Sequence, residues 1–106
     1  MRTLHLALAV SNIESSVMEY SARLGASPVV IIPGEYALWR TAALNLSIRN
    51  TSERPGTMRH LGWEDTDAAE FSTETDCNGV TWEKFSASHQ AQEINEIWPG
   101  TNYQPA

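Results

Sequence analysis

The sequence predicts an α+β domain in which a β-rich first half is followed by a shortened, related second half and a final helix. Three patterns lead to this expectation: an alternating apolar strand at the N-terminus, helical periodicity directly after it, and a second His-Leu strand start in the middle of the chain. The chain has 106 residues. This length suits one compact domain, and we therefore expect residues 1–106 to form a single unit.

The N-terminal segment 4–10 is predicted as a strand because bulky and small side chains alternate along it. The bulky face would carry Leu4, Leu6, Leu8 and Val10. His5 falls on the opposite face with Ala7 and Ala9. A face of small side chains leaves space above the sheet, so His5 is expected to lie on a face that can line a cavity.

A helix is predicted directly after this strand. Ser11 followed three residues later by Glu14 matches a capping box, which places the helix start at Ser11. Apolar residues recur at helical spacing at Ile13, Val17, Tyr20 and Leu24. Gly25 stands where a C-terminal glycine would end the helix.

Three further strands complete the first half, which covers residues 1–50. The β-branched run at 29–32 ends at a Pro-Gly turn signal, and the segments 35–41 and 43–50 have the residue types and alternation of strands. The predicted order of the first half is therefore strand, helix and three strands.

The second half, residues 57–85, begins with the same His-Leu pair as the first strand and forms a weak internal repeat. A hairpin is expected around Asn78-Gly79, because this dipeptide favours a tight two-residue turn. Residues 86–98 carry apolar side chains at helical spacing and end at Pro99-Gly100, which predicts a C-terminal helix.

Composition excludes several functions. The net charge is −6 and no basic stripe is present, which argues against binding to nucleic acids or anionic membranes. No apolar run reaches the roughly 20 residues that a membrane span needs. Cys77 is the single cysteine, so no intrachain disulfide can form. A protein of the reducing cytoplasm is expected.

Three residues suggest a metal site. His5, His60 and Glu83 each lie on the less bulky or more polar face of their predicted strands. If these faces line one concave sheet, the side chains converge, and two imidazoles with one carboxylate can hold a divalent metal with open positions for a substrate. The alternative is a hydrogen-bonded core histidine at position 5, a surface His60 and a Glu83 at the rim.

Other polar and aromatic residues are candidates for substrate contact. Glu64 shares a strand face with His60 and is a candidate general base near the metal. Asn45 and Arg49 lie on the polar face of their strand and are candidates for binding an anionic substrate. A substrate wall could also be formed by Tyr36, Trp39 and Arg40, although strand aromatics commonly serve packing.

The segment "HLALAVSNIESSVMEYSARLGASP" resembles the opening of the vicinal oxygen chelate superfamily, which includes glyoxalase I, fosfomycin- and bleomycin-resistance proteins and extradiol dioxygenases. In order, "YALWRTAALNLSIRN", "RHLGWE" and "DCNGVTWEKF" are most similar to its branch of cadmium-induced proteins and organoarsenical lyases. The resemblance covers residues 3 to 85 and implies paired βαβββ modules in a curved mixed sheet. Carried over one by one, the family's metal ligands fall on His5, His60 and Glu83.

The second half departs from this family pattern. Only 22 residues separate His60 from Glu83, too few for a full βαβββ module, so a helix and a strand are expected to be missing. The paired cysteines of the lyase branch would lie in that missing segment, and Cys77 is no substitute, so carbon–arsenic cleavage is not expected. The C-terminal helix is expected to fill the space that the missing helix leaves.

The resemblance therefore implies a small glyoxalase- or dioxygenase-like metalloprotein that binds an oxygen-chelating small molecule. Fe²⁺, Mn²⁺, Ni²⁺ and Zn²⁺ all suit its two-histidine, one-carboxylate set. One alternative is a metal-free protein of the same fold that sequesters a toxin or an antibiotic, and another is a scaffold that has lost its site. A shortened second half would leave a sheet edge exposed, so a homodimer with the cleft near the subunit interface is expected.

Overall fold

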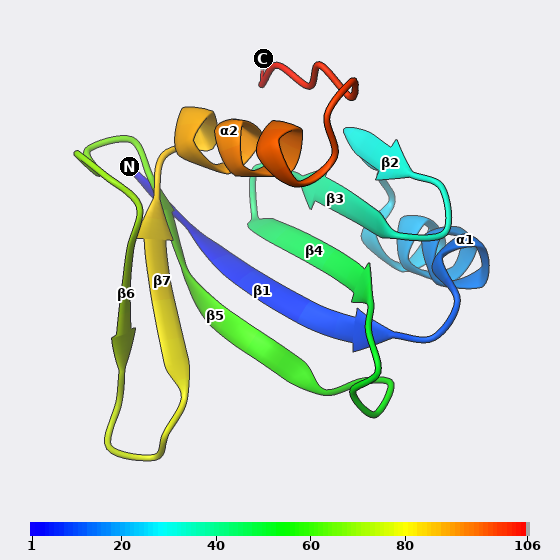
Figure 1. Cartoon of the computed structure of the whole chain (residues 1–106), viewed down its shortest axis with the longest axis horizontal. Helices are drawn as coiled ribbons and strands as arrows, with labels where there is room; N and C mark the ends of the chain where they lie inside the picture. The colour runs from blue at the N-terminus through cyan, green and yellow to red at the C-terminus, as the bar shows by residue number, and fades with distance from the viewer. Residues whose placement is uncertain (106) are drawn as a thin grey trace.

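The structure, a computed structural model, describes residues 1–105. It is an α+β fold with seven strands in one curved mixed sheet and two helices (Figure 1). The elements in chain order are β1 (Arg2–Val10), α1 (Ile13–Leu24), β2 (Val30–Ile32), β3 (Tyr36–Arg40), β4 (Leu44–Asn50), β5 (Met58–Asp65), β6 (Ser72–Thr75), β7 (Thr81–Phe85) and α2 (Ala87–Ile97). The predicted strand–helix–three-strand order of the first half is confirmed.

The sheet joins the two halves of the chain along β1 and β5. Its strand order is β2-β3-β4-β1-β5-β7-β6. β1 pairs in parallel with β4 and antiparallel with β5, and β5 pairs in parallel with β7. The predicted hairpin around Asn78-Gly79 is the turn between β6 and β7. The central strands β1, β5 and β7 therefore lie side by side.

Helix α1 packs on one face of the first half. Its start differs from the prediction: the N-cap is Asn12, whose side-chain oxygen accepts a hydrogen bond from the Ser15 N–H at 2.8 Å. The predicted capping box of Ser11 and Glu14 is wrong, because Asn12 supplies the capping side chain. Gly25 ends the helix with a φ of 64°, as predicted. Beneath α1 lies a core of buried side chains that includes Ile13, Ala37, Trp39, Leu46 and Ile48.

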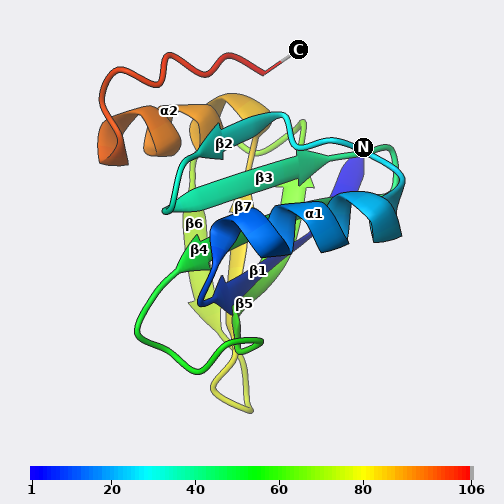
Figure 2. The same ribbon diagram turned by 90° about the vertical axis from the view of Figure 1, so that its right-hand side faces the viewer.

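Helix α2 packs on the opposite face of the sheet (Figure 2). Ile94 packs with Tyr36 and Leu38, which alternate with the residues beneath α1. The chain then turns back over α2, where Asn95 exchanges two hydrogen bonds with the backbone of Tyr103. α2 therefore covers the face that carries His5. A second-half counterpart of α1 would lie on the other face, so α2 does not fill the space of the missing helix as expected.

The second half is shorter than the first, as expected. In the part of the chain that the structure describes, β5 is followed by a turn-rich link at 66–71 and then by β6 and β7, with no helix among them. Neither α1 nor α2 combines the length and the apolar character needed to cross a bilayer.

Candidate metal centre

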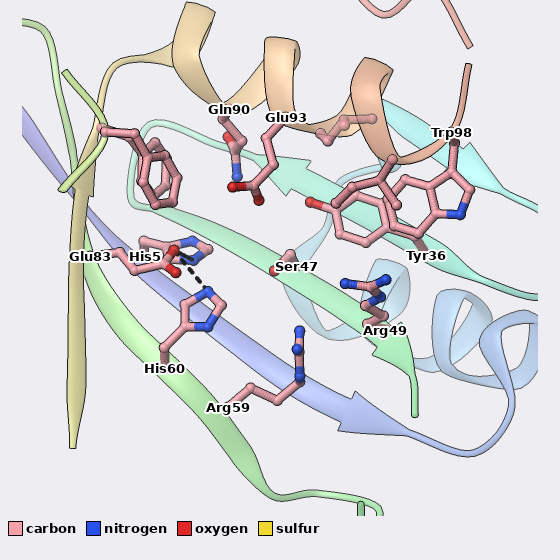
Figure 3. Close-up of a pocket in the computed structure, with 14 residues that line it drawn as sticks. His5, Tyr36, Ser47, Arg49, Arg59, His60, Glu83, Gln90, Glu93 and Trp98 are labelled. Carbon is pink, nitrogen blue, oxygen red and sulfur yellow. Dashed lines mark ion pairs between the residues drawn. The ribbon is translucent and has the colours of Figure 1, made fainter. Parts of the chain in front are cut away.

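His5, His60 and Glu83 converge in one cavity between the sheet and α2 (Figure 3). They come from the neighbouring strands β1, β5 and β7. His60 Nε2 lies 3.0 Å and His5 Nε2 lies 3.9 Å from Glu83 Oε1. The donor atoms of the group all lie within 4.8 Å of one another. This spacing brings three ligands of suitable type within reach of one cation.

Strand register accounts for this convergence. On β1, His5 and Ala7 share a face, and Ala7 pairs with His60 of β5. Gly62 of β5 pairs with both His5 and Glu83. A Cβ atom at Gly62 would overlap the backbone carbonyl of Glu83. The absence of a side chain therefore lets β5 and β7 approach closely at the level of the cavity.

A β-bulge changes which side chains of β5 reach the cavity. The pairing of β1 with β5 shifts between Ala7 and Leu8. Successive side chains of a regular strand point to opposite faces, and a bulge relaxes this alternation. As a result both Arg59 and His60 line the same cavity.

The amide of Asn45 fixes the proton on His5. Asn45 Nδ2 donates to Glu64 Oε1 and to Gln90 Oε1, each at 2.8 Å. A carboxylate can only accept, so the orientation of the amide is determined and its oxygen faces His5. His5 Nδ1 lies 2.8 Å from that oxygen and must therefore carry the proton. Nε2 then keeps its lone pair for the cavity.

His5 Nε2 is the atom that most clearly points to a bound ligand, because the His5 side chain is only 2% exposed to solvent. This nitrogen is buried and has no hydrogen-bond partner. The rings of His5 and Phe85 are nearly perpendicular, with centroids 4.9 Å apart. Burial lowers the pKa of His5, which favours the neutral ring that binds metals. A buried, unpartnered lone pair beside a second imidazole and a carboxylate fits a divalent cation.

Glu64 does not lie in this cavity. Its Oε1 accepts from Arg40 Nε at 2.8 Å and its Oε2 accepts from Arg40 Nη2 at 2.9 Å. The hydrogen bonds and charge of Arg40 lower the pKa of Glu64. A carboxylate with both oxygens occupied and a lowered pKa is a poor proton acceptor. The expected role of general base does not fit this placement, and Glu64 instead holds Asn45 in position.

The predicted substrate residues divide into two groups. Arg49 lines the cavity as expected, and so does Tyr36. Asn45 is fully buried, and its amide is already bonded to His5, Glu64 and Gln90. It therefore positions the candidate metal ligand His5 and does not contact a substrate. The expectation that Trp39 contacts substrate is wrong. Trp39 lies in the core beneath α1, where its indole N–H donates to the Ala26 carbonyl. The alternation of β3 turns Trp39 away from the cavity face.

Several residues of the cavity were not expected from the sequence. They are Ser47, Arg59, Phe71, Gln90, Glu93, Ile94, Ile97 and Trp98, together with Phe85. The alternation of β4 places Ser47 on the face of Asn45 and Arg49, so this residue could have been found. The residues of α2 share one helix face, but the sequence does not say which part of the sheet that face meets.

Comparison with known proteins adds no assignment. No family model matches the chain, and no curated protein matches its sequence.

Proposed function

We propose that the chain is a small metalloprotein that binds one divalent cation through His5, His60 and Glu83 and takes a small oxygen-chelating ligand beside it. The observation that carries this proposal is the buried Nε2 of His5, which has no hydrogen-bond partner. The Asn45 contact keeps the ring proton on Nδ1, so Nε2 has a free lone pair. A protein that used His5 only for packing would be expected to satisfy this nitrogen.

We also propose that the fold is an abbreviated form of the vicinal oxygen chelate fold. Support comes from the strand–helix–three-strand first half, the curved mixed sheet and the cavity on the face opposite α1. The three sequence motifs in their order support it independently. Fold alone does not fix an activity, so the functional part of the proposal rests on the site.

The residues around the site are arranged to bind and orient a ligand. His5, His60 and Glu83 would hold Fe²⁺, Mn²⁺, Ni²⁺ or Zn²⁺, and such a cation supplies Lewis-acid polarisation of ligand oxygens. Phe71 stacks on Phe85, with ring centroids 5.5 Å apart, and these rings exclude water from one side of the cavity. The hydroxyls of Tyr36 and Ser47 line the other part and offer hydrogen bonds to a bound ligand.

The test is the metal content of the protein purified without chelator and measured by inductively coupled plasma mass spectrometry. We expect about one metal per chain in the wild type and loss of that metal in His60→Ala. His89→Gln is the matched control, because His89 lies outside the cavity lining and glutamine suits its position at the third residue of α2. Wild-type protein that stays metal-free after incubation with each of the four cations would overturn the proposal and favour metal-free sequestration.

A further inference from the structure

Two arginines line the same cavity as the candidate metal ligands. Arg49 comes from β4 and Arg59 from the bulged part of β5. Figure 3 shows both side chains pointing into the cavity on one side of the His5, His60 and Glu83 group. A cavity that combines a metal site with two guanidinium groups is suited to a negatively charged ligand.

Arg49 keeps its hydrogen-bond donors available. Its guanidinium carbon lies 5.1 Å from the centre of the Trp98 ring, so a cation–π contact holds the group in place. Among residues 1–105, no carboxylate forms an ion pair with Arg49. A cation held by an aromatic ring alone can direct its N–H groups to an incoming oxyanion.

Arg59 is partly engaged but retains its terminal donors. Its Nε donates to Glu53 Oε1 at 3.1 Å, and Glu53 lies outside the cavity lining. This contact fixes the orientation of the side chain and uses only one of the five N–H donors. The bulge directs the rest of the guanidinium into the cavity beside His60.

The charges of the lining make anion binding depend on the cation. The two arginines are balanced by two carboxylates, Glu83 and Glu93, while the histidines add no charge in the form that binds a metal. A divalent cation would leave the lining with an excess of positive charge.

The cavity limits the size of the ligand. The cavity has a volume of about 40 Å³. On the same measure a single water molecule needs about 10–15 Å³, so the cavity has space for only a few atoms of that size. The exposed side chains of Glu93 and Ile97 stand at its mouth. Only a small ligand can lie wholly within the cavity.

From these observations we infer that Arg49 and Arg59 form an oxyanion subsite beside the metal centre, and that the ligand is a small carboxylate or similar oxyanion. This inference rests on the proposed metal site and names the class of ligand that the site takes. A cation held by His5, His60 and Glu83 would bind oxygen of the ligand, and the two guanidinium groups would neutralise its anionic charge.

The experiment is a calorimetric titration of the Zn²⁺-loaded protein with oxalate and with its neutral isostere oxamide. Arg49→Gln and Arg59→Gln are each expected to weaken oxalate binding about tenfold or more, because each removes a charge-assisted contact. Oxamide affinity should change much less. Arg54→Gln, which removes an exposed arginine outside the lining, should leave both affinities unchanged.

Glu93→Gln provides a test of the opposite sign. Removing this carboxylate lowers the repulsion of an anion, so oxalate should bind several-fold more tightly to this variant. Oxalate affinities that stay at the wild-type value in both Arg49→Gln and Arg59→Gln, with the metal content intact, would overturn the subsite and leave the proposed metal site standing.

Failure of the metal site is a separate outcome. If the wild-type protein binds no metal, the subsite is tested in the metal-free Glu93→Gln protein, whose lining carries an excess positive charge. Oxalate binding that is lost on adding Arg59→Gln would support the subsite without a metal, and no oxalate binding would overturn it.

Discussion

The side-chain oxygen of Asn45 lies 2.8 Å from Nδ1 of His5, and the two residues stand directly opposite each other on the parallel strands β4 and β1. Asn45 is held from the far side by Glu64 and Gln90. Arg40 in turn holds Glu64 through two hydrogen bonds. A chain of polar contacts thus runs from the Arg40–Glu64 ion pair to the imidazole that faces the cavity.

Replacing Asn45 should weaken metal binding without removing a ligand. In Asn45→Leu the His5 Nδ1 proton loses its acceptor, so neither the tautomer nor the ring orientation stays fixed. Loss of such a supporting contact typically lowers metal affinity about 10–100-fold. Competition titration with a chromophoric Zn²⁺ chelator measures this change.

Ser47→Ala is the matched control for Asn45→Leu. Ser47 lies two residues further along β4 and lines the cavity, but it forms no hydrogen bond with His5. Its replacement should leave the Zn²⁺ affinity within about threefold of the wild type, well short of the loss expected for a supporting contact. Equal losses in the two variants would mean that Asn45 acts through general packing.

The stability of the metal-free protein should fall in mild acid. Burial lowers the pKa of His5 below its usual value of 6.5, so the unfolded chain binds this proton more readily than the folded chain. Stability is therefore full above pH 6.5 and declines as the pH falls toward the lowered pKa of the folded state. A difference of one pKa unit between the two states corresponds to about 1.4 kcal/mol.

Chemical denaturation at pH 7.5, 6.0 and 5.0 measures this effect, with His5→Gln as the comparison. The variant should lose less unfolding free energy between pH 7.5 and 5.0 than the wild type. Glu64 has a lowered pKa because of Arg40, so a further decline belongs below its usual value of 4.5 and is absent from the window measured. Identical pH profiles for wild type and variant would contradict the buried, neutral state of His5.

Much of the fold and the core of the site follow from local patterns. Alternation along the strands is a property of neighbouring residues, so the cavity faces of His5 and Glu83 could be predicted from the sequence. The helix start was misplaced by one residue because Ser11 and Asn12 are both good capping residues, and local sequence does not choose between them.

The remainder depends on contacts between distant segments. Arg59 reaches the cavity through a bulge that arises only when β1 and β5 pair. In β3, Leu38 and Trp39 are both apolar and both fully buried, so hydrophobicity gives no sign of which one meets α1. Nothing in the sequence indicates that Glu64 binds Arg40 outside the cavity, because the two residues lie 24 positions apart.

Gly62 should resist substitution more strongly than other glycines with positive φ. In Gly62→Ala the new Cβ would overlap the Glu83 carbonyl and lie 2.6 Å from the Glu83 nitrogen. Strands β5 and β7 would have to separate, which moves Glu83 away from His60. We expect a loss of about 3 kcal/mol in unfolding free energy, at the upper end of overpacking costs, together with weaker Zn²⁺ binding.

Gly79→Ala isolates the backbone cost of such a change. Gly79 has a φ of 79° in the turn between β6 and β7, and a Cβ there would meet no atom within 4 Å. Its replacement should cost about 1–2 kcal/mol from conformation alone and leave Zn²⁺ affinity unchanged. Denaturation and Zn²⁺ titration of the two variants side by side check the difference, and equal Zn²⁺ affinities would contradict the close β5–β7 contact.

The face of the sheet opposite the cavity is left without a helix in the second half. α1 packs over β3 and β4, and Figure 1 shows it far from β6 and β7. Register places Leu4, Trp63 and Trp82 on this uncovered face, with Leu4 36% exposed. Trp98, at the C-terminal end of α2, packs against Tyr36 on the cavity side of the sheet and therefore does not lie on the uncovered face.

A second copy of the chain is the simplest cover for this uncovered face, so we predict a two-fold dimer formed through Leu4, Trp63 and Trp82. The cavity lies on the other face of the sheet, so its mouth would stay open in this dimer. This arrangement differs from the sequence-based expectation, which placed the cleft near the subunit interface.

Sedimentation velocity across a micromolar concentration range measures the mass. Leu4→Lys should shift the protein to monomer, because a charge would be buried in the interface. Ile31→Lys, at the exposed edge strand β2, should leave it dimeric. A monomeric wild type would contradict the dimer, and dissociation by Ile31→Lys alone would move the interface to the β2 edge.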